Sequence, residues 1–160
     1  RSHFGSRTYS LPVSASLPRS AAMVRPSIRV DRGFFKTQEE VDRDVKSTGF
    51  AASRFVTPVS GELPMHWHKM DVITYVMDGE TYFLDAEGRR LDVRVGDRVV
   101  IPAGAVHAEG EVKSPMTYVV TTEREEPLKD ALRMFDPASD SSNPKPMARG
   151  GKKGVQHSRL

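Results

Sequence analysis

The stretch GDRVVIPAGAVH, residues 96–107, carries the clearest structural pattern of the chain. Gly96-Asp97 is a turn pair, and the β-prone run 98–101 follows it directly. Pro102-Ala103-Gly104 forms a second turn, after which a further β-prone run begins at residue 106. The stretch therefore predicts two short strands joined by a tight turn, with a histidine near the start of the second strand.

Short runs of the same kind extend from residue 50 to residue 122. They are Phe50–Val59, Val72–Met77, Thr81–Leu84, Leu91–Val95, Arg98–Ile101, Val106–Val112 and Met116–Thr122. Asp78-Gly79, between two alternating segments, is a strong hairpin signal. Short strands at this spacing, with no helices between them, predict an all-β antiparallel sandwich or barrel.

One short helix is expected on each side of the strands. Thr37-Gln38-Glu39-Glu40 has the pattern of a capping box and predicts a helix to about Lys46 that ends near Gly49. A second helix is expected over residues 127–135. Its apolar residues share one face and would pack against the strands; they are Leu128, Leu132 and Phe135.

Charge and composition divide the chain into three segments. Residues 1–30 contain five Arg and no acidic residue, and we expect them to be disordered, as a fragment end or an organellar transit peptide. Residues 31–135 carry a net charge of −5 and form the single predicted domain. Residues 136–160 are expected to be a disordered basic tail. Because the basic residues concentrate outside the domain, the sequence gives no nucleic-acid footprint.

The sequence also excludes several kinds of chemistry and location. It contains no cysteine, so any metal must be held by His, Asp or Glu. No apolar run approaches the roughly 18 to 20 residues of a membrane span. We expect a cytoplasmic protein without a membrane partner. The alternative is a peroxisomal protein, because Ser158-Arg159-Leu160 is similar to the Ser-Lys-Leu address.

A second histidine motif, His66-Trp67-His68, lies just before the run that starts at Val72. Residues i and i+2 of a strand share a face, so both imidazoles would project the same way with Cα atoms about 6.5 to 7 Å apart. Two imidazoles at that separation can converge on one metal ion. Alone, the pair is a weak indication of a metal site.

Together, the two histidine-bearing stretches resemble the two motifs of the cupin superfamily. Residues 96–107 have the spacing G-x5-P-x-G-x2-H of the second motif without a gap. Residues 61–79 resemble the first motif, G-x5-H-x-H-x3,4-E-x6-G, with one residue fewer before the first histidine. The resemblance implies a double-stranded β-helix, the jelly-roll barrel of cupins. It also implies a metal ion on the inner face, held by His66, His68 and His107.

The chain departs from the motif at the glutamate that usually provides a fourth ligand, because Val72 occupies that position. Asp71 could act as a ligand if a turn or bulge swings it inward; otherwise it is a solvated residue at the strand entry. Glu109 and Glu111 share parity with His107, so on an unbroken strand both face the barrel interior. We predict them as acid–base groups, with inward charges at a solvated barrel mouth as the alternative. The simplest site is three histidines alone.

These features predict a metal-binding cupin with one divalent ion, which is iron, manganese, nickel or zinc. The expected function is a small metal-dependent enzyme of the dioxygenase, isomerase or lyase type, acting on a small oxygenated or anionic molecule. The alternatives are a non-catalytic cupin that binds or senses a metal or small ligand, and a structural cupin without metal. A homodimer through Phe34-Phe35 and the strand 50–59 is expected as an alternative to a monomer.

Overall fold

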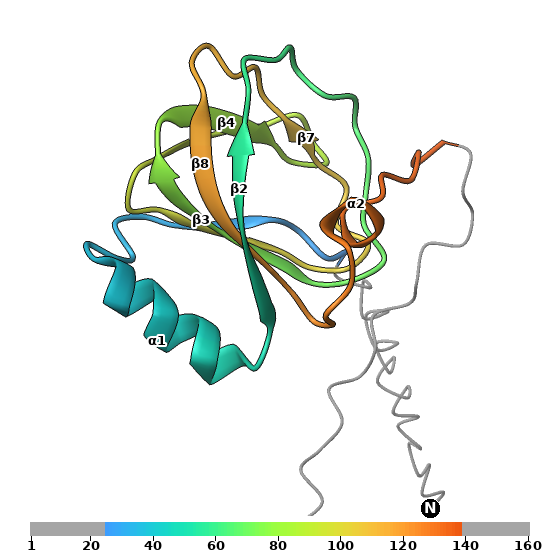
Figure 1. Cartoon of the computed structure of the whole chain (residues 1–160). Helices are drawn as coiled ribbons and strands as arrows, with labels where there is room; N and C mark the ends of the chain where they lie inside the picture. The colour runs from blue at the N-terminus through green and yellow to red at the C-terminus, as the bar shows by residue number, and fades with distance from the viewer. Residues whose placement is uncertain (1–24, 139–160) are drawn as a thin grey trace, which may run out of the picture.

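The computed structural model describes residues 25–138 of the chain (Figure 1). The predictions made for residues 1–24 and 139–160, including the transit peptide and the peroxisomal address, lie outside the described residues. In chain order the elements are β1 (Arg29–Asp31), α1 (Gln38–Thr48), β2 (Ala51–Thr57), β3 (Val72–Asp78), β4 (Glu80–Leu84), β5 (Arg90–Arg94), β6 (Arg98–Ile101), β7 (Ala108–Glu109), β8 (Met116–Thr122) and α2 (Leu128–Ala131). The predicted all-β fold with one short helix on each side is confirmed.

Two antiparallel sheets enclose the interior of the barrel (Figure 1). The larger sheet has the strand order β1-β6-β3-β8-β2, and the smaller one has the order β5-β4-β7. Side chains from both sheets form one buried apolar cluster, with Val76, Val99 and Val120 from the larger sheet and Phe83 and Val93 from the smaller one. This shared core makes the two sheets the walls of a single jelly-roll barrel.

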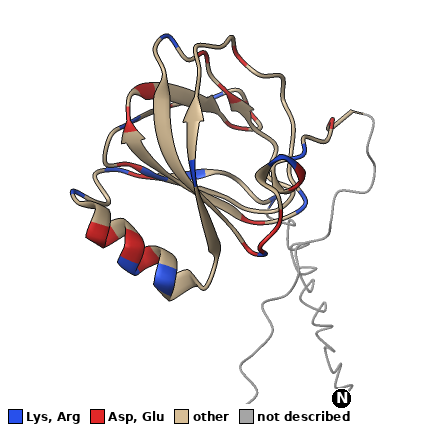
Figure 2. Ribbon diagram, in the orientation of Figure 1, with Lys and Arg blue, Asp and Glu red and all other residues tan. Residues whose placement is uncertain are grey.

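Helix α1 covers the outer face of the larger sheet, on the side away from the barrel interior (Figure 1). The capping box at Thr37 is present, and the helix ends at Gly49, whose φ of 73° is in the left-handed region that glycine adopts freely. Val41 is fully buried against this face of the sheet, whereas the exposed side of α1 carries both acidic and basic side chains (Figure 2).

The polar anchor between α1 and the sheet is Asp44. Its carboxylate accepts a hydrogen bond from the Tyr75 hydroxyl at 2.7 Å and one from the Arg98 guanidinium at 2.6 Å. Burial and the hydrogen bond to Asp44 raise the pKa of Tyr75, so its phenol stays protonated. The helix therefore lies on the barrel through both apolar and charge-assisted contacts.

The first strand lies partly in the segment that was expected to be disordered. Strand β1 pairs antiparallel with β6, and Asp31 lies opposite Arg98 in that register. The guanidinium of Arg98 also donates to the Asp31 carboxylate at 2.7 Å. A three-residue strand is too short to stand out in a sequence, yet here this pairing orders it.

The second helix is shorter than predicted. It spans only four residues, and the chain then becomes extended, so that Phe135 pairs with Trp67 through two backbone hydrogen bonds of 3.0 and 3.1 Å. The Phe135 ring stacks on the Trp67 indole with a centroid distance of 4.8 Å. In the described part of the chain, no helix has the length and apolar character that a membrane span requires.

Of the Phe34-Phe35 pair in the predicted dimer interface, Phe34 is exposed and Phe35 is buried. Phe35 is only 6% exposed and lies edge-on against Tyr75, where α1 covers both rings. Phe34 is 37% exposed and lies under the Arg98 guanidinium, which is 3.6 Å from the ring centroid. Exposed apolar side chains do occur on the edge strand β2, at Phe55 and Val56. A homodimer stays a prediction.

Candidate metal centre

The three motif histidines come together at one end of the barrel. His66 and His107 pair through an isolated antiparallel bridge, so their side chains lie on the same side of the two backbone segments. Their ring centroids are 4.4 Å apart, and the His68 ring is 4.9 Å from His66 and 5.2 Å from His107. Trp67 points to the other side, as the alternation of a strand predicts, and is buried against Phe135.

Each imidazole is oriented by a backbone carbonyl. The Nδ1 atoms of His66, His68 and His107 lie 2.8, 3.1 and 2.8 Å from carbonyl oxygens. Because a carbonyl can only accept, each Nδ1 carries the proton and each Nε2 has its lone pair free. The three carbonyls belong to Pro64, Arg133 and Ala105, respectively. Hydrogen bonds of this kind fix the tautomer and ring orientation of metal-binding histidines.

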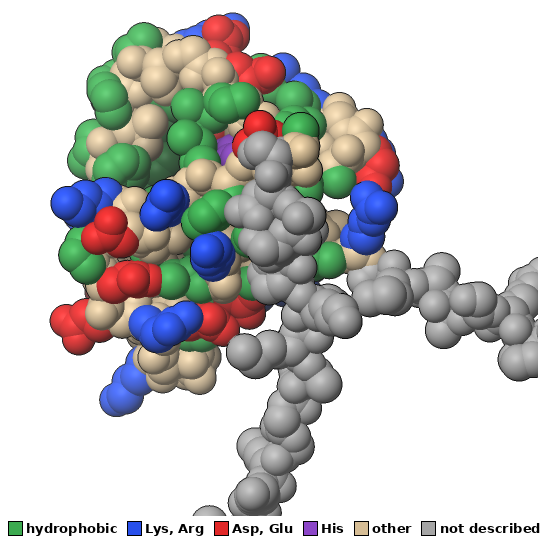
Figure 3. All heavy atoms as spheres, turned by 90° about the vertical axis from the view of Figure 1, so that its right-hand side faces the viewer, with side chains coloured by type: hydrophobic (Ala, Val, Ile, Leu, Met, Phe, Trp, Pro, Cys, Tyr) green, Lys and Arg blue, Asp and Glu red, His purple; other side chains and the backbone are tan. Residues whose placement is uncertain are grey.

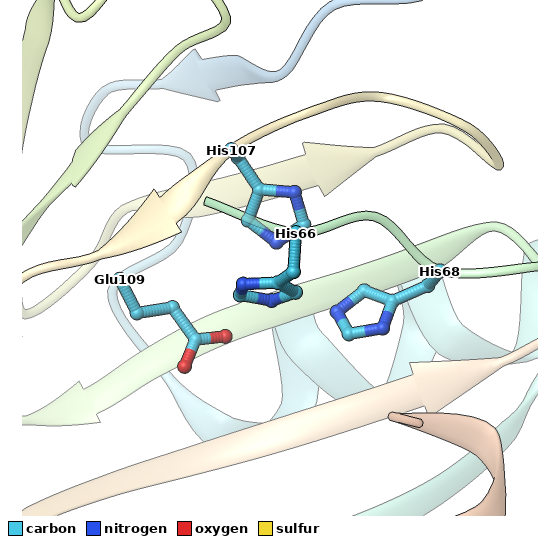
Figure 4. Close-up of side chains that lie close together, drawn as sticks. All are labelled: His66, His68, His107 and Glu109. Carbon is cyan, nitrogen blue, oxygen red and sulfur yellow. The ribbon is translucent and has the colours of Figure 1, made fainter. Parts of the chain in front are cut away.

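The free nitrogens converge with a carboxylate from β7. Ligand atoms of His66, His68, His107 and Glu109 all lie within 4.8 Å of one another, and Figure 4 shows the four side chains directed toward a common centre. The Nε2 atoms of His66 and His107 are buried and have no hydrogen-bond partner among the described residues. Buried polar atoms are rarely left unpaired, and a metal ion would satisfy both. The residues present therefore fit a divalent metal ion.

Burial keeps the imidazoles of His68 and His107 in the neutral form that binds metals. It lowers the pKa of His68 to about 4 and that of His107 to about 3, because an imidazolium ion loses its hydration there. Hydrogen bonds to the carbonyls of Arg133 and Ala105 oppose these shifts only in part. Burial likewise raises the pKa of Glu109, and a nearby cation such as a metal ion would favour its ionised form.

The other two predicted carboxylates lie elsewhere. Asp71 is not one of the four grouped residues, because its carboxylate faces the turn after β6 and accepts a hydrogen bond from the Ala103 amide at 2.8 Å. In this structure the Asp71 carboxylate thus lies apart from the imidazole group. Glu111 has a 49% exposed side chain and pairs with Lys113 at 3.2 Å, so it lies at the rim. Of the predicted acid–base pair, only Glu109 joins the histidines.

A cavity of about 110 Å³ adjoins this group. His68 and Glu109 line it, together with side chains that occupy no specified position of either sequence motif, among them Thr74 and Tyr118. Val72 also lines it, so the residue that replaces the motif glutamate contributes an apolar wall. Figure 3 shows a histidine side chain in a hollow between hydrophobic side chains.

Comparison with known proteins agrees with this architecture. Residues 53–121 match the family described as "Cupin domain". Over 93 residues the chain is 31% identical to acireductone dioxygenase 1 of Physcomitrium patens. The match covers 49% of this chain and 48% of that protein. The chain thus spans about half the length of the curated relative that it matches.

The chain is also similar, over part of its length, to several solved structures. The DMSP lyase DddQ from Ruegeria pomeroyi DSS-3 is 26% identical with a TM-score of 0.42, over 48% of this chain and 39% of that one. A DUF861 family protein from Thermotoga maritima is 16% identical with a TM-score of 0.45, over 59% of this chain and 98% of that one. With the matched motifs and the barrel described above, residues 53–121 are a cupin domain.

Proposed function

We propose that this chain is a metal-dependent enzyme that binds one divalent ion on His66, His68, His107 and Glu109. The observation that carries the proposal is the convergence of three buried imidazoles and one carboxylate, with every Nδ1 already bonded to a backbone carbonyl. A site whose ligands are held in the binding tautomer before the ion arrives is typical of metal centres.

Glu109 provides the carboxylate ligand that the motif glutamate, replaced here by Val72, usually provides. Its side chain approaches the imidazoles from β7 rather than from β3, yet it brings an oxygen to the same group of nitrogens. A donor set of imidazoles and one carboxylate suits iron, manganese, nickel or zinc. When bound, such an ion supplies Lewis-acid polarisation of a substrate oxygen.

The cavity favours a small substrate. Its volume of about 110 Å³ is below the range of about 300 to 1,000 Å³ that drug-sized ligands occupy. His68 and Glu109 line it, so a molecule in the cavity would lie beside the ligand group. Among dioxygenase, isomerase and lyase reactions, the similarity to acireductone dioxygenase 1 favours the dioxygenase.

Oxygen uptake tests this proposal. The protein is loaded separately with each of the four ions, and oxygen consumption is followed with a panel of small 2-hydroxy and 2-oxo acids and enediols, with product analysis by NMR. We expect turnover with at least one ion, lost in Glu109→Gln and kept in Glu111→Gln, because only Glu109 belongs to the ligand group. Binding of panel members without any conversion would instead indicate a sensing or storage cupin.

A further inference from the structure

We infer that the cavity beside the metal site takes a small monoanion with an apolar body, and that Thr74 and Tyr118 bind its oxygen atoms. The inference rests on the proposed function, because the ion would hold the anionic end of the ligand. It follows from the lining of the cavity, its charge, and two hydroxyl groups that lack good partners in the described part of the chain.

Most of the cavity wall is apolar. Leu63, Val72, Ile101, Val112, Val120 and Leu132 contribute aliphatic side chains, and Phe55 and Phe83 add two rings. A ligand that fills this space gains by removing apolar surface from water. A molecule with an aliphatic body fits the wall, whereas a polyhydroxylated one would leave its hydroxyl groups without partners.

The charge of the site limits the charge of the ligand. Among the described residues that line the cavity, Glu109 carries a carboxyl group and no Lys or Arg is present. A divalent ion, three neutral imidazoles and one carboxylate leave a net charge of about one positive unit. One negative charge on the ligand balances it, but a phosphate group would bring further buried charge without a partner.

Thr74 lines this cavity and carries an unpaired hydroxyl. It lies on the inner face of β3, opposite Val99 on one side and Val120 on the other, and is 8% exposed. Its Oγ1 atom is buried and has no hydrogen-bond partner among the described residues. A buried hydroxyl without a partner costs free energy, so a hydroxyl kept here is best explained by a ligand atom that pairs with it.

Tyr118 supplies a second polar group on the neighbouring strand β8. Its hydroxyl donates to the Met116 Sδ atom at 3.5 Å, and a thioether is a weak acceptor. The side chain lines the same cavity as Thr74, His68 and Glu109. The phenol is therefore free to exchange its weak contact for a stronger hydrogen bond to a ligand oxygen.

Calorimetric titration of the metal-loaded protein tests the inference with three probes. The first is 2-hydroxybutanoate, a chelating monoanion with an apolar end. The second is phosphoglycolate, which carries more negative charge, and the third is 1,2-butanediol, which is uncharged. We expect 2-hydroxybutanoate to bind at least about tenfold more tightly than either of the others. Thr74→Val and Tyr118→Phe should each weaken its binding about tenfold, whereas Thr117→Val, a substitution outside the cavity lining, should change it less than about twofold.

A second readout separates ligand binding from a structural role. Because the Thr74 hydroxyl has no partner among the described residues, Thr74→Val should leave the thermal unfolding midpoint unchanged or raise it, while binding weakens. A lower midpoint with unchanged binding would overturn the assignment. So would equal binding of phosphoglycolate, or no binding of 2-hydroxybutanoate, to protein that contains the ion. Metal content is measured on the same samples: protein that takes up no ion contradicts the proposed function itself, and the inference falls with it.

Discussion

His66 and His107 exchange both backbone hydrogen bonds across the site, with N···O distances of 2.8 and 2.9 Å. The two motifs, some 40 residues apart in the sequence, are thus joined at the ligands themselves. Because the two residues lie directly opposite each other, their side chains emerge on one side and need only a short reach to share an ion. The backbone pairing therefore places the two imidazoles side by side without the help of a metal ion.

Replacing the carboxylate of the ligand group should weaken metal binding selectively. Glu109→Gln keeps the size of the side chain but removes its negative charge, so we expect the affinity for the divalent ion to fall at least about tenfold. Competition with a chromophoric chelator at neutral pH measures this change. Glu111→Gln is the matched control, because Glu111 lies at the rim beside Lys113. Equal affinities in the two variants would show that Glu109 is not a ligand.

The stability of the metal-free protein should depend on the pH through the buried histidines. The pKa of His68 falls from 6.5, the usual value, to about 4 on folding. Between these values the unfolded chain binds a proton that the folded chain does not, so the free energy of unfolding falls as the pH falls. The slope is up to about 1.4 kcal/mol per pH unit for each such group.

Urea unfolding in the presence of a chelator, from pH 7 to pH 4, measures this dependence. His68→Gln removes one of the titrating groups, so its stability should fall less steeply than that of the wild type over the same range. Parallel curves for the two proteins would mean that His68 does not stay neutral in the folded state.

Gly110 is closely covered by Tyr82 at the rim of the barrel. A Cβ atom at Gly110 would lie 2.6 Å from the Tyr82 ring, which is held by a hydrogen bond to Glu62 and by the Arg90 guanidinium. We therefore expect Gly110→Ala to reduce the free energy of unfolding by about 1 to 3 kcal/mol. Gly61→Ala is the control, because nothing lies within 4 Å of a Cβ there.

A double variant tests whether contact with the Tyr82 ring causes the loss of stability in Gly110→Ala. In a Tyr82→Ala background the ring is gone, so adding Gly110→Ala should cost much less than it does in the wild type. An equal cost in both backgrounds would show that contact with the ring is not responsible.

Much of the barrel was predictable because its strands are short, regular and bounded by turn residues. The expected runs 72–77, 81–84, 98–101 and 116–122 agree with β3, β4, β6 and β8 to within a residue at each end. Strand β1 could not be found in the same way. Its order comes from pairing with β6 and from the ion pair of Asp31 with Arg98, which are contacts distant in sequence.

The site was predictable in its histidines but not in its carboxylate. The spacing within the two motifs indicated the three histidines. Strand alternation places Glu109 and Glu111 on the same face, so it could not distinguish between them. The structure separates them, because β7 ends at Glu109 and Glu111 lies at the rim. The imidazoles are oriented by the backbone carbonyls of Pro64, Ala105 and Arg133. Every residue type has such a carbonyl, so the sequence does not indicate these contacts. Thr74 and Tyr118 were missed because nothing but the cavity distinguishes them from other strand residues.

The most direct test of the metal centre is the metal content of purified wild-type protein beside His107→Ala, both reconstituted and then dialysed. We predict about one iron, manganese, nickel or zinc ion per wild-type chain and a loss of the ion in the variant, with circular dichroism showing that the variant keeps its fold. A wild-type protein that holds no stoichiometric ion after reconstitution with any of the four, or a folded variant that holds as much as the wild type, would contradict the proposed site.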